Sequence, residues 1–194
     1  SVLTTLVTDE LDFPNLSMVG VDDRAAAYTA VDYLIRQGHR KIAVLGGPVT
    51  SYPSLMRRQG AQQAMEDAGI VFNDKLYGLS NYDFESAYHA MNSLLARRAE
   101  FTALFAMSDV IAFGAIRALV SAGMRVPEDV SVIGFDGITM SRYCVPVMTT
   151  IVQPSEQIAL QSIELLVRQI EHGSSAQTVT LQPELQQGES VRAI

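Results

Sequence analysis

Residues 126–153, VPEDVSVIGFDGITMSRYCVPVMTTIVQ, decide the expected fold. Their centre, residues 130–135, is a short run rich in β-branched and apolar residues, bounded by Pro127 and by Asp136-Gly137. Such a run predicts a strand buried on both faces, as in a parallel α/β sheet. Asp136 would lie just beyond the carboxyl end of this strand, in the crevice where open α/β sheets bind ligands. The alternative is that Asp136 forms a turn with Gly137, as Asp-Gly pairs often do.

Composition and charge narrow the possible classes of protein. The chain has 194 residues, 48% of them hydrophobic, which suffices for one good core or two small lobes. It contains no uncharged apolar window of about 18 residues, so no membrane span is predicted. Residues 1–7 have neither a positively charged lead nor a cleavage site, unlike a signal peptide.

The charge and the single cysteine add two further expectations. A formal net charge of −7 and a pI near 4.9 argue against nucleic-acid binding by this chain, because phosphate contacts need clustered Lys and Arg. Cys144 is alone, so we expect no intrachain disulfide and no cysteine metal site. A reduced, cytoplasmic setting fits this cysteine usage.

Strand and helix patterns alternate between residues 19 and 135 and predict an α/β fold with a doubly wound parallel sheet. Helix stops are expected at Gly38, Gly69 and Gly123. We expect Asp23 and Asp109 to cap the helices that follow them. Strands are expected over 2–7, 17–21, 42–45, 76–79, 102–106, 130–135, 149–152 and 178–181, with a last extended piece over 185–191. Helices are expected over 24–37, 56–68, 84–98, 109–122 and 154–170.

Arg57 stands out because it is placed in the first turn of the helix expected over 56–68. The amino end of a helix carries partial positive charge, so a cation is poorly placed there. Contact with a ligand would explain this cost, since the planar guanidinium suits bidentate contacts to hydroxyl or carboxylate groups. The alternative is a solvated surface arginine, as we expect for Arg58. The preceding glycine loop has neither GxGxxG nor GxxxxGK[ST], so no nucleotide cofactor is predicted.

Three segments resemble, in the right order, segments of LacI/GalR-family transcriptional repressors. They are VPEDVSVIGFD (126–136) followed by TTIVQP (149–154), QGHRKIA (37–43) and MSDVIAFG (107–114). Ser108 departs from the asparagine of many members, and Asp23 departs from the usual Asp-Asn pair. The resemblance implies a type I periplasmic-binding-protein-like fold with parallel doubly wound sheets in two lobes, the first incomplete in this chain. Residues 1–22 would be a remnant of the first lobe, 23–152 the second lobe, 153–181 a return to the first lobe, and 182–194 a carboxyl-terminal tail.

The resemblance also implies an effector site. Arg57 and Gly60 match the family's RxxG, whose arginine faces the effector, and Tyr82 stands where such sensors place an aromatic ring against the ligand. The alternative for Tyr82 is packing on the following helix. The effector would be a sugar, sugar phosphate or nucleoside, bound between lobes that close about hinges near residues 22, 152 and 181. The expected effector contacts are Asp136, Arg57, Tyr82, Ser108, Asp109 and Ser51.

Partners follow from the same resemblance. A homodimer is implied through Phe113, Ile116 and Tyr143, and ordinary core packing is the alternative for Phe113 and Ile116. Operator DNA would be bound only through a headpiece that this chain lacks. We expect no cofactor and no metal.

Three classes of function can be compared on the sequence. The VSVIGFD and GHRKIA segments favour the effector-sensing module of a repressor over a sugar-binding receptor of the same fold for uptake or chemoreception, which would need an export signal. An enzyme is not predicted, because His39, His89 and His172 lie far apart in the sequence. Neither HExxH nor GxSxG is present.

Overall fold

The computed structural model describes residues 5–6, 17–172 and 175–194. They belong to two compact units, one made of Ser1–Asp22 with Gln153–Glu184, and a second made of Asp23–Val152 with Leu185–Ile194. Of the strand expected over 2–7, the described part is β1 (Thr5–Leu6). The loop expected over 8–16 lies outside the described residues.

The second unit is built on a six-stranded sheet with the strand order β4-β3-β5-β6-β7-β9. Its strands are β3 (Ile42–Gly46), β4 (Tyr77–Leu79), β5 (Ala103–Ala106), β6 (Ser131–Asp136), β7 (Thr149–Val152) and β9 (Glu184–Gln186). Its helices are α1 (Asp23–Arg36), α2 (Tyr52–Asp67), α3 (Phe84–Ala96) and α4 (Asp109–Ser121), with short 3-10 turns η1 (Asp74–Leu76) and η2 (Thr139–Arg142).

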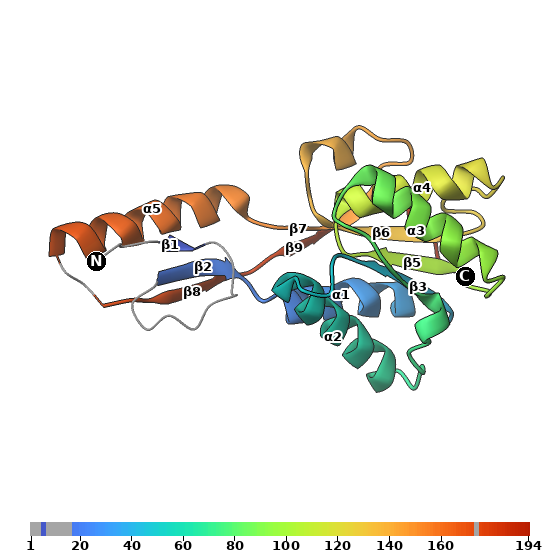
Figure 1. Cartoon of the computed structure of the whole chain (residues 1–194), viewed down its shortest axis with the longest axis horizontal. Helices are drawn as coiled ribbons and strands as arrows, with labels where there is room; N and C mark the ends of the chain where they lie inside the picture. Colours follow the sequence, from blue (N-terminus) through green and yellow to red (C-terminus); the bar gives the residue numbers. More distant parts are fainter. Residues whose placement is uncertain (1–4, 7–16, 173–174) are drawn as a thin grey trace. The chain divides into compact units, whose positions relative to one another are not determined.

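The sheet is predominantly parallel and doubly wound, as the sequence predicts. The pairs β3–β4, β3–β5, β5–β6 and β6–β7 are all parallel. Figure 1 shows α1 and α2 on one face of this sheet and α3 and α4 on the other. Every residue of β3 and β5 is buried, which explains why both strands are continuous apolar runs. The chain leaves β3 for β4 on one side and returns to β5 on the other, so the winding reverses between β3 and β5.

Close helix packing beside this sheet depends on a glycine that the sequence analysis matched to RxxG. A Cβ on Gly60 would overlap the carbonyl oxygen of Arg24, so α1 and α2 approach closely only with glycine at this position. The core beneath the helices is formed by large, fully buried side chains, among them Phe105, Phe135 and Ile133.

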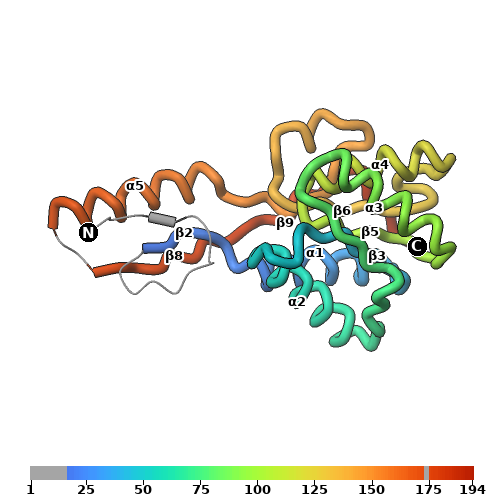
Figure 2. The backbone as a smooth tube through the Cα atoms, viewed as in Figure 1, coloured from blue at the N-terminus to red at the C-terminus, as the bar shows by residue number. Residues whose placement is uncertain are grey.

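The carboxyl-terminal residues are part of the second unit. The Ser190 hydroxyl donates to the carbonyl of Val132 at 2.6 Å and accepts from the backbone N–H of Thr149 at 2.8 Å. The backbone N–H of Ile194 donates to the carbonyl of Gln37 at 2.9 Å. Figure 2 shows this end of the chain, in red, lying within the second unit. Regular strand pairing stops at Gln186, earlier than the extended piece expected to residue 191.

The first unit has a three-stranded parallel sheet with the order β1-β2-β8, in which β2 spans Ser17–Val21 and β8 spans Thr178–Leu181. Helix α5 (Ser155–His172) packs Ile158 and Leu165 against Val19 and Val21. Four of its other large apolar side chains are exposed, at 61% for Leu160 and Ile163, 42% for Val167 and 62% for Ile170.

The predicted start of α2 is wrong, and so are the predicted caps of α1 and α4. Helix α2 begins at Tyr52, four residues before the expected start, because Ser51 caps it and Pro53 suits its first turn. Arg57 therefore lies in the second turn, where the helix dipole no longer disfavours a cation. Ser108, and not Asp109, caps α4, since its hydroxyl accepts from the N–H of Val110 at 3.2 Å. Asp23 lies inside the first turn of α1.

Candidate functional site

Arg57 is buried at the carboxyl edge of the second unit's sheet and holds several segments together. Its Nε donates to Oδ1 of Asp23 at 2.6 Å, and its Nη1 donates to the carbonyl oxygen of Met107 at 2.5 Å. The same Nη1 lies 3.5 Å from Oδ1 of Asp136. The guanidinium carbon stands 3.7 Å from the centroid of the Phe135 ring, a cation–π contact. A solvated surface arginine, the alternative considered from the sequence, is thus excluded.

Asp136 lies both at the carboxyl end of a strand and in a turn with Gly137, the two positions that the sequence left open. It is the last residue of β6, and its side chain, 25% exposed, faces Arg57. It also enters a turn, because its φ is +111° and that of Gly137 is +71°. Such a conformation is costly for a residue with a side chain and is typical of functional sites. Val152 fills the space beside Gly137, so a Cβ there would overlap it.

Asp109 is completely buried behind this edge. Its Oδ1 accepts from the Thr150 hydroxyl at 2.6 Å, and its Oδ2 accepts from the backbone N–H of Ile138 at 2.9 Å. Burial raises the pKa of this carboxyl to about 6, although the hydrogen bond from Thr150 partly offsets the effect. A Cβ on Gly134 would overlap Oδ1 of Asp109, so β6 needs glycine where it passes this carboxylate. Asp109 therefore positions the turn after Asp136.

Tyr82 packs over the glycine loop that follows β3. A Cβ on Gly47 would overlap the Tyr82 ring, so the ring lies directly against the loop backbone. Tyr82 has a φ of +59°, and its buried hydroxyl has no hydrogen-bond partner among the described residues. An unpaired buried hydroxyl is unfavourable, and a ligand or water would relieve it.

The structure brings most of the predicted site residues to one edge. Ser51 and Ser108 lie at the amino ends of α2 and α4, after β3 and β5, where both hydroxyls cap helices. From the sequence, Asp23 was predicted only as a helix cap, and Met107, whose carbonyl accepts a hydrogen bond from Arg57, was not predicted at the site. The one sequence signal for this role of Asp23 was that it stands where members of the family usually have an Asp-Asn pair. A carbonyl contact has no signature in the sequence.

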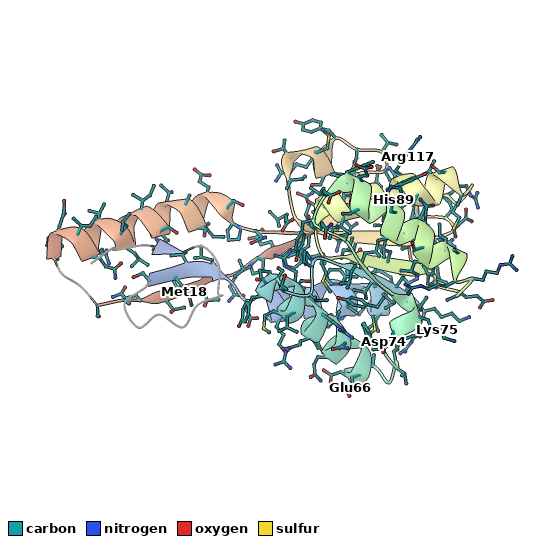
Figure 3. The ribbon with its side chains drawn as sticks, viewed as in Figure 1. Met18, Glu66, Asp74, Lys75, His89 and Arg117 are labelled. Carbon is teal, nitrogen blue, oxygen red and sulfur yellow. The ribbon has the colours of Figure 1, made fainter. Side chains whose placement is uncertain are left out.

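The residues expected at a dimer interface differ in exposure. Phe113 and Ile116 are half-buried and pack against the core of the second unit, whereas Tyr143 is 78% exposed. Figure 3 shows Arg117, the residue after Ile116, on the same side of this unit as His89 and opposite Glu66. The interface remains a prediction.

Other candidate residues have structural partners. Arg58 is not simply solvated, because its guanidinium stands 4.5 Å from the centroid of the Tyr77 ring and 3.2 Å from a carboxylate oxygen of Asp74. His39 is buried, with Nδ1 2.9 Å from the Thr102 hydroxyl. Within residues 5–6, 17–172 and 175–194, no cluster of three or more His, Cys, Asp or Glu side chains could hold a metal ion. In the same part of the chain, every helix is too short or too polar to cross a membrane.

A parallel doubly wound unit with an Arg–Asp cluster at the strand ends defines an α/β ligand-binding domain. The family model of the periplasmic binding protein-like domain matches residues 31–191. The chain therefore belongs to the periplasmic binding protein-like domain family. The resemblance to LacI/GalR regulators is also confirmed, because curated relatives are transcriptional repressors and several similar solved structures are LacI family regulators.

Three relatives illustrate the similarity. The chain is 35% identical over 181 residues to the HTH-type transcriptional repressor PurR of Histophilus somni strain 129Pt, covering 93% of this chain and 54% of that protein. The structure of the transcriptional regulator CelR–cellobiose complex matches with a TM-score of 0.90 and 32% identity over 96% of this chain and 57% of that one. A LacI family regulator from Enterococcus faecium with bound ribose matches with a TM-score of 0.90 and 26% identity over 99% and 71%. The chain spans about half the length of the curated relatives it matches.

Proposed function

We propose that the chain is the effector-sensing and dimerisation module of a LacI-type transcriptional regulator, and that it binds a small sugar-like or nucleoside-like ligand. The observation that carries the proposal is the buried Arg57, held between Asp23 and Asp136 where the winding of the sheet reverses. Open α/β sheets bind ligands at such switch points. The cellobiose and ribose bound to two similar regulators support a polyhydroxyl ligand.

The proposed roles of the site residues differ with their exposure to solvent. Asp136 contacts the ligand directly, because its partly exposed carboxylate can accept hydrogen bonds from ligand hydroxyls. The Tyr82 hydroxyl, which has no hydrogen-bond partner within residues 5–6, 17–172 and 175–194, supplies a further polar contact. Arg57 fixes the orientation of Asp136, and Asp109, Ser108 and Ser51 hold the loops that shape the edge.

Binding of a panel of neutral sugars and nucleosides, including cellobiose, ribose and adenosine, tests the proposal by thermal shift and then by calorimetry. Asp136→Asn keeps the side-chain volume, and asparagine tolerates positive φ. We expect it to weaken binding of any probe at least about tenfold, or 1.4 kcal/mol. Asp74→Asn is the matched control, because Asp74 is 82% exposed and pairs with Arg58 away from this edge. Absence of binding by the whole panel, or equal losses in both variants, would contradict the proposed function.

The partners in the proposal follow the regulators that the chain resembles. A homodimer would form through Phe113, Ile116 and Tyr143, and operator DNA would be bound by another part of the regulator. The setting would be the cytoplasm, and no catalytic role is proposed. The names of the relatives favour this over a receptor for uptake or chemoreception, since those reported above are transcriptional regulators.

A further inference from the structure

The charge of Arg57 is already neutralised inside the fold, which bears on the ligand of the proposed function. Nε of Arg57 binds Asp23 at 2.6 Å, and both side chains are less than one-tenth exposed. A second carboxylate, Asp136, lies 3.5 Å from Nη1, and the Met107 carbonyl takes a further hydrogen bond. Asp109, fully buried, is close enough to Asp136 for the two carboxylates to repel each other. One guanidinium thus pairs with two carboxylates, and a third carboxylate, that of Asp109, lies close to Asp136.

The helix dipoles at this edge do not reverse the excess of negative over positive charge. The amino ends of α2 and α4 both lie at this edge, and each contributes roughly half a positive charge. Helix α4 carries Asp109 in its first turn, which offsets its dipole, whereas α2 has no acidic residue there. Near pH 7.5, above the pKa of Asp109, the three carboxylates still outweigh Arg57 and the dipoles of α2 and α4 taken together. The potential at the edge is therefore negative.

We infer that the part of the ligand that meets this edge carries hydroxyl or amine donors, and no phosphate or carboxylate. Asp136 offers acceptor oxygens to such donors. A phosphate would meet like charges, and Arg57 could pair with it only by giving up Asp23 or Asp136 in a buried place, which is costly. This inference rests on the proposed function and narrows its ligand to a neutral or cationic molecule. Asp23 is then the residue that sets the charge preference, although it need not touch the ligand.

Matched probes test the inference: ribose against ribose 5-phosphate, and adenosine against AMP, titrated calorimetrically at pH 7.5. We expect each neutral probe that binds to do so at least about tenfold more tightly than its phosphate. Raising the salt from about 0.05 to about 0.5 M should reduce this ratio, because salt screens the repulsion. Equal or tighter binding of the phosphates would overturn the inference and leave the proposed function intact. Failure of all four probes and of cellobiose would contradict the proposed function itself.

The variant Asp23→Asn tests whether Asp23 causes the preference for neutral over phosphorylated probes. This variant removes the charge that neutralises Arg57 and keeps the side-chain size, so we expect the neutral-to-phosphate ratio to fall at least about fivefold. Asp129→Asn is the control, because it causes the same change in net charge at the Asp129–Arg125 pair, before the amino end of β6. A fall of equal size in both variants would overturn the role of Asp23. If Asp23→Asn does not fold, the wild-type ratio and its salt dependence decide the inference.

Discussion

Replacing Asp109 by asparagine should make the domain more stable at neutral and alkaline pH. The folded protein holds this carboxylate without exposure to water, with Thr150 and Ile138 as hydrogen-bond partners. Asparagine has the same shape and no charge. Its oxygen can accept from the Ile138 N–H, and its amide can donate to the Thr150 hydroxyl, so both contacts survive the substitution.

The size of the effect follows from the pKa of Asp109. Burial raises it from 3.8 to about 6, which corresponds to about 3 kcal/mol. The folded state binds this proton more tightly than the unfolded chain does. The contribution of Asp109 to stability is therefore fully present below about pH 4 and is lost as the pH rises through about 6. Above pH 6 the wild type bears the cost of a buried charge, and the variant, with its neutral amide at this position, does not.

Urea unfolding of Asp109→Asn and wild type from pH 4 to pH 8 measures this cost. We expect similar free energies of unfolding near pH 4 and a variant more stable by up to about 3 kcal/mol near pH 8. Asp74→Asn, at an 82% exposed position, should leave the shape of the wild-type pH profile unchanged. Parallel profiles for Asp109→Asn and wild type, or a variant that is less stable at pH 8, would refute the reasoning.

Three further outcomes are expected. Gly134→Ala should destabilise the domain by about 1–3 kcal/mol in urea unfolding, because its Cβ would overlap Oδ1 of Asp109; an unchanged midpoint would show that β6 can shift. Leu160→Glu combined with Ile163→Lys should reduce self-association measured by light scattering, since both side chains are 61% exposed on α5; a wild-type chain that is already monomeric would contradict this. The chain should not retard operator DNA at physiological salt, given its net charge of −7, and a salt-sensitive gel shift would count against that expectation.

Much of the second unit was predictable because its elements are specified locally. Strands such as β3 and β5 are buried on both faces, so their sequences are continuous apolar runs that stand out. Glycines with positive φ at positions 38, 69 and 123 follow the helices, as the sequence indicated. Two predicted site residues, Arg57 and Asp136, meet at the edge where parallel strands end.

Other features depend on residues far apart in the chain. The carboxylate of Asp23 suits a helix cap by local rules, yet it pairs with Arg57, 34 positions away. Asp109 looks like another cap, but the packed sheet buries it against Thr150, 41 positions away, and this burial raises its pKa. A sequence specifies which groups can ionise or donate hydrogen bonds. Only tertiary packing determines which of them lose water and which charge stands beside them, because both depend on strands and helices brought together across the sheet.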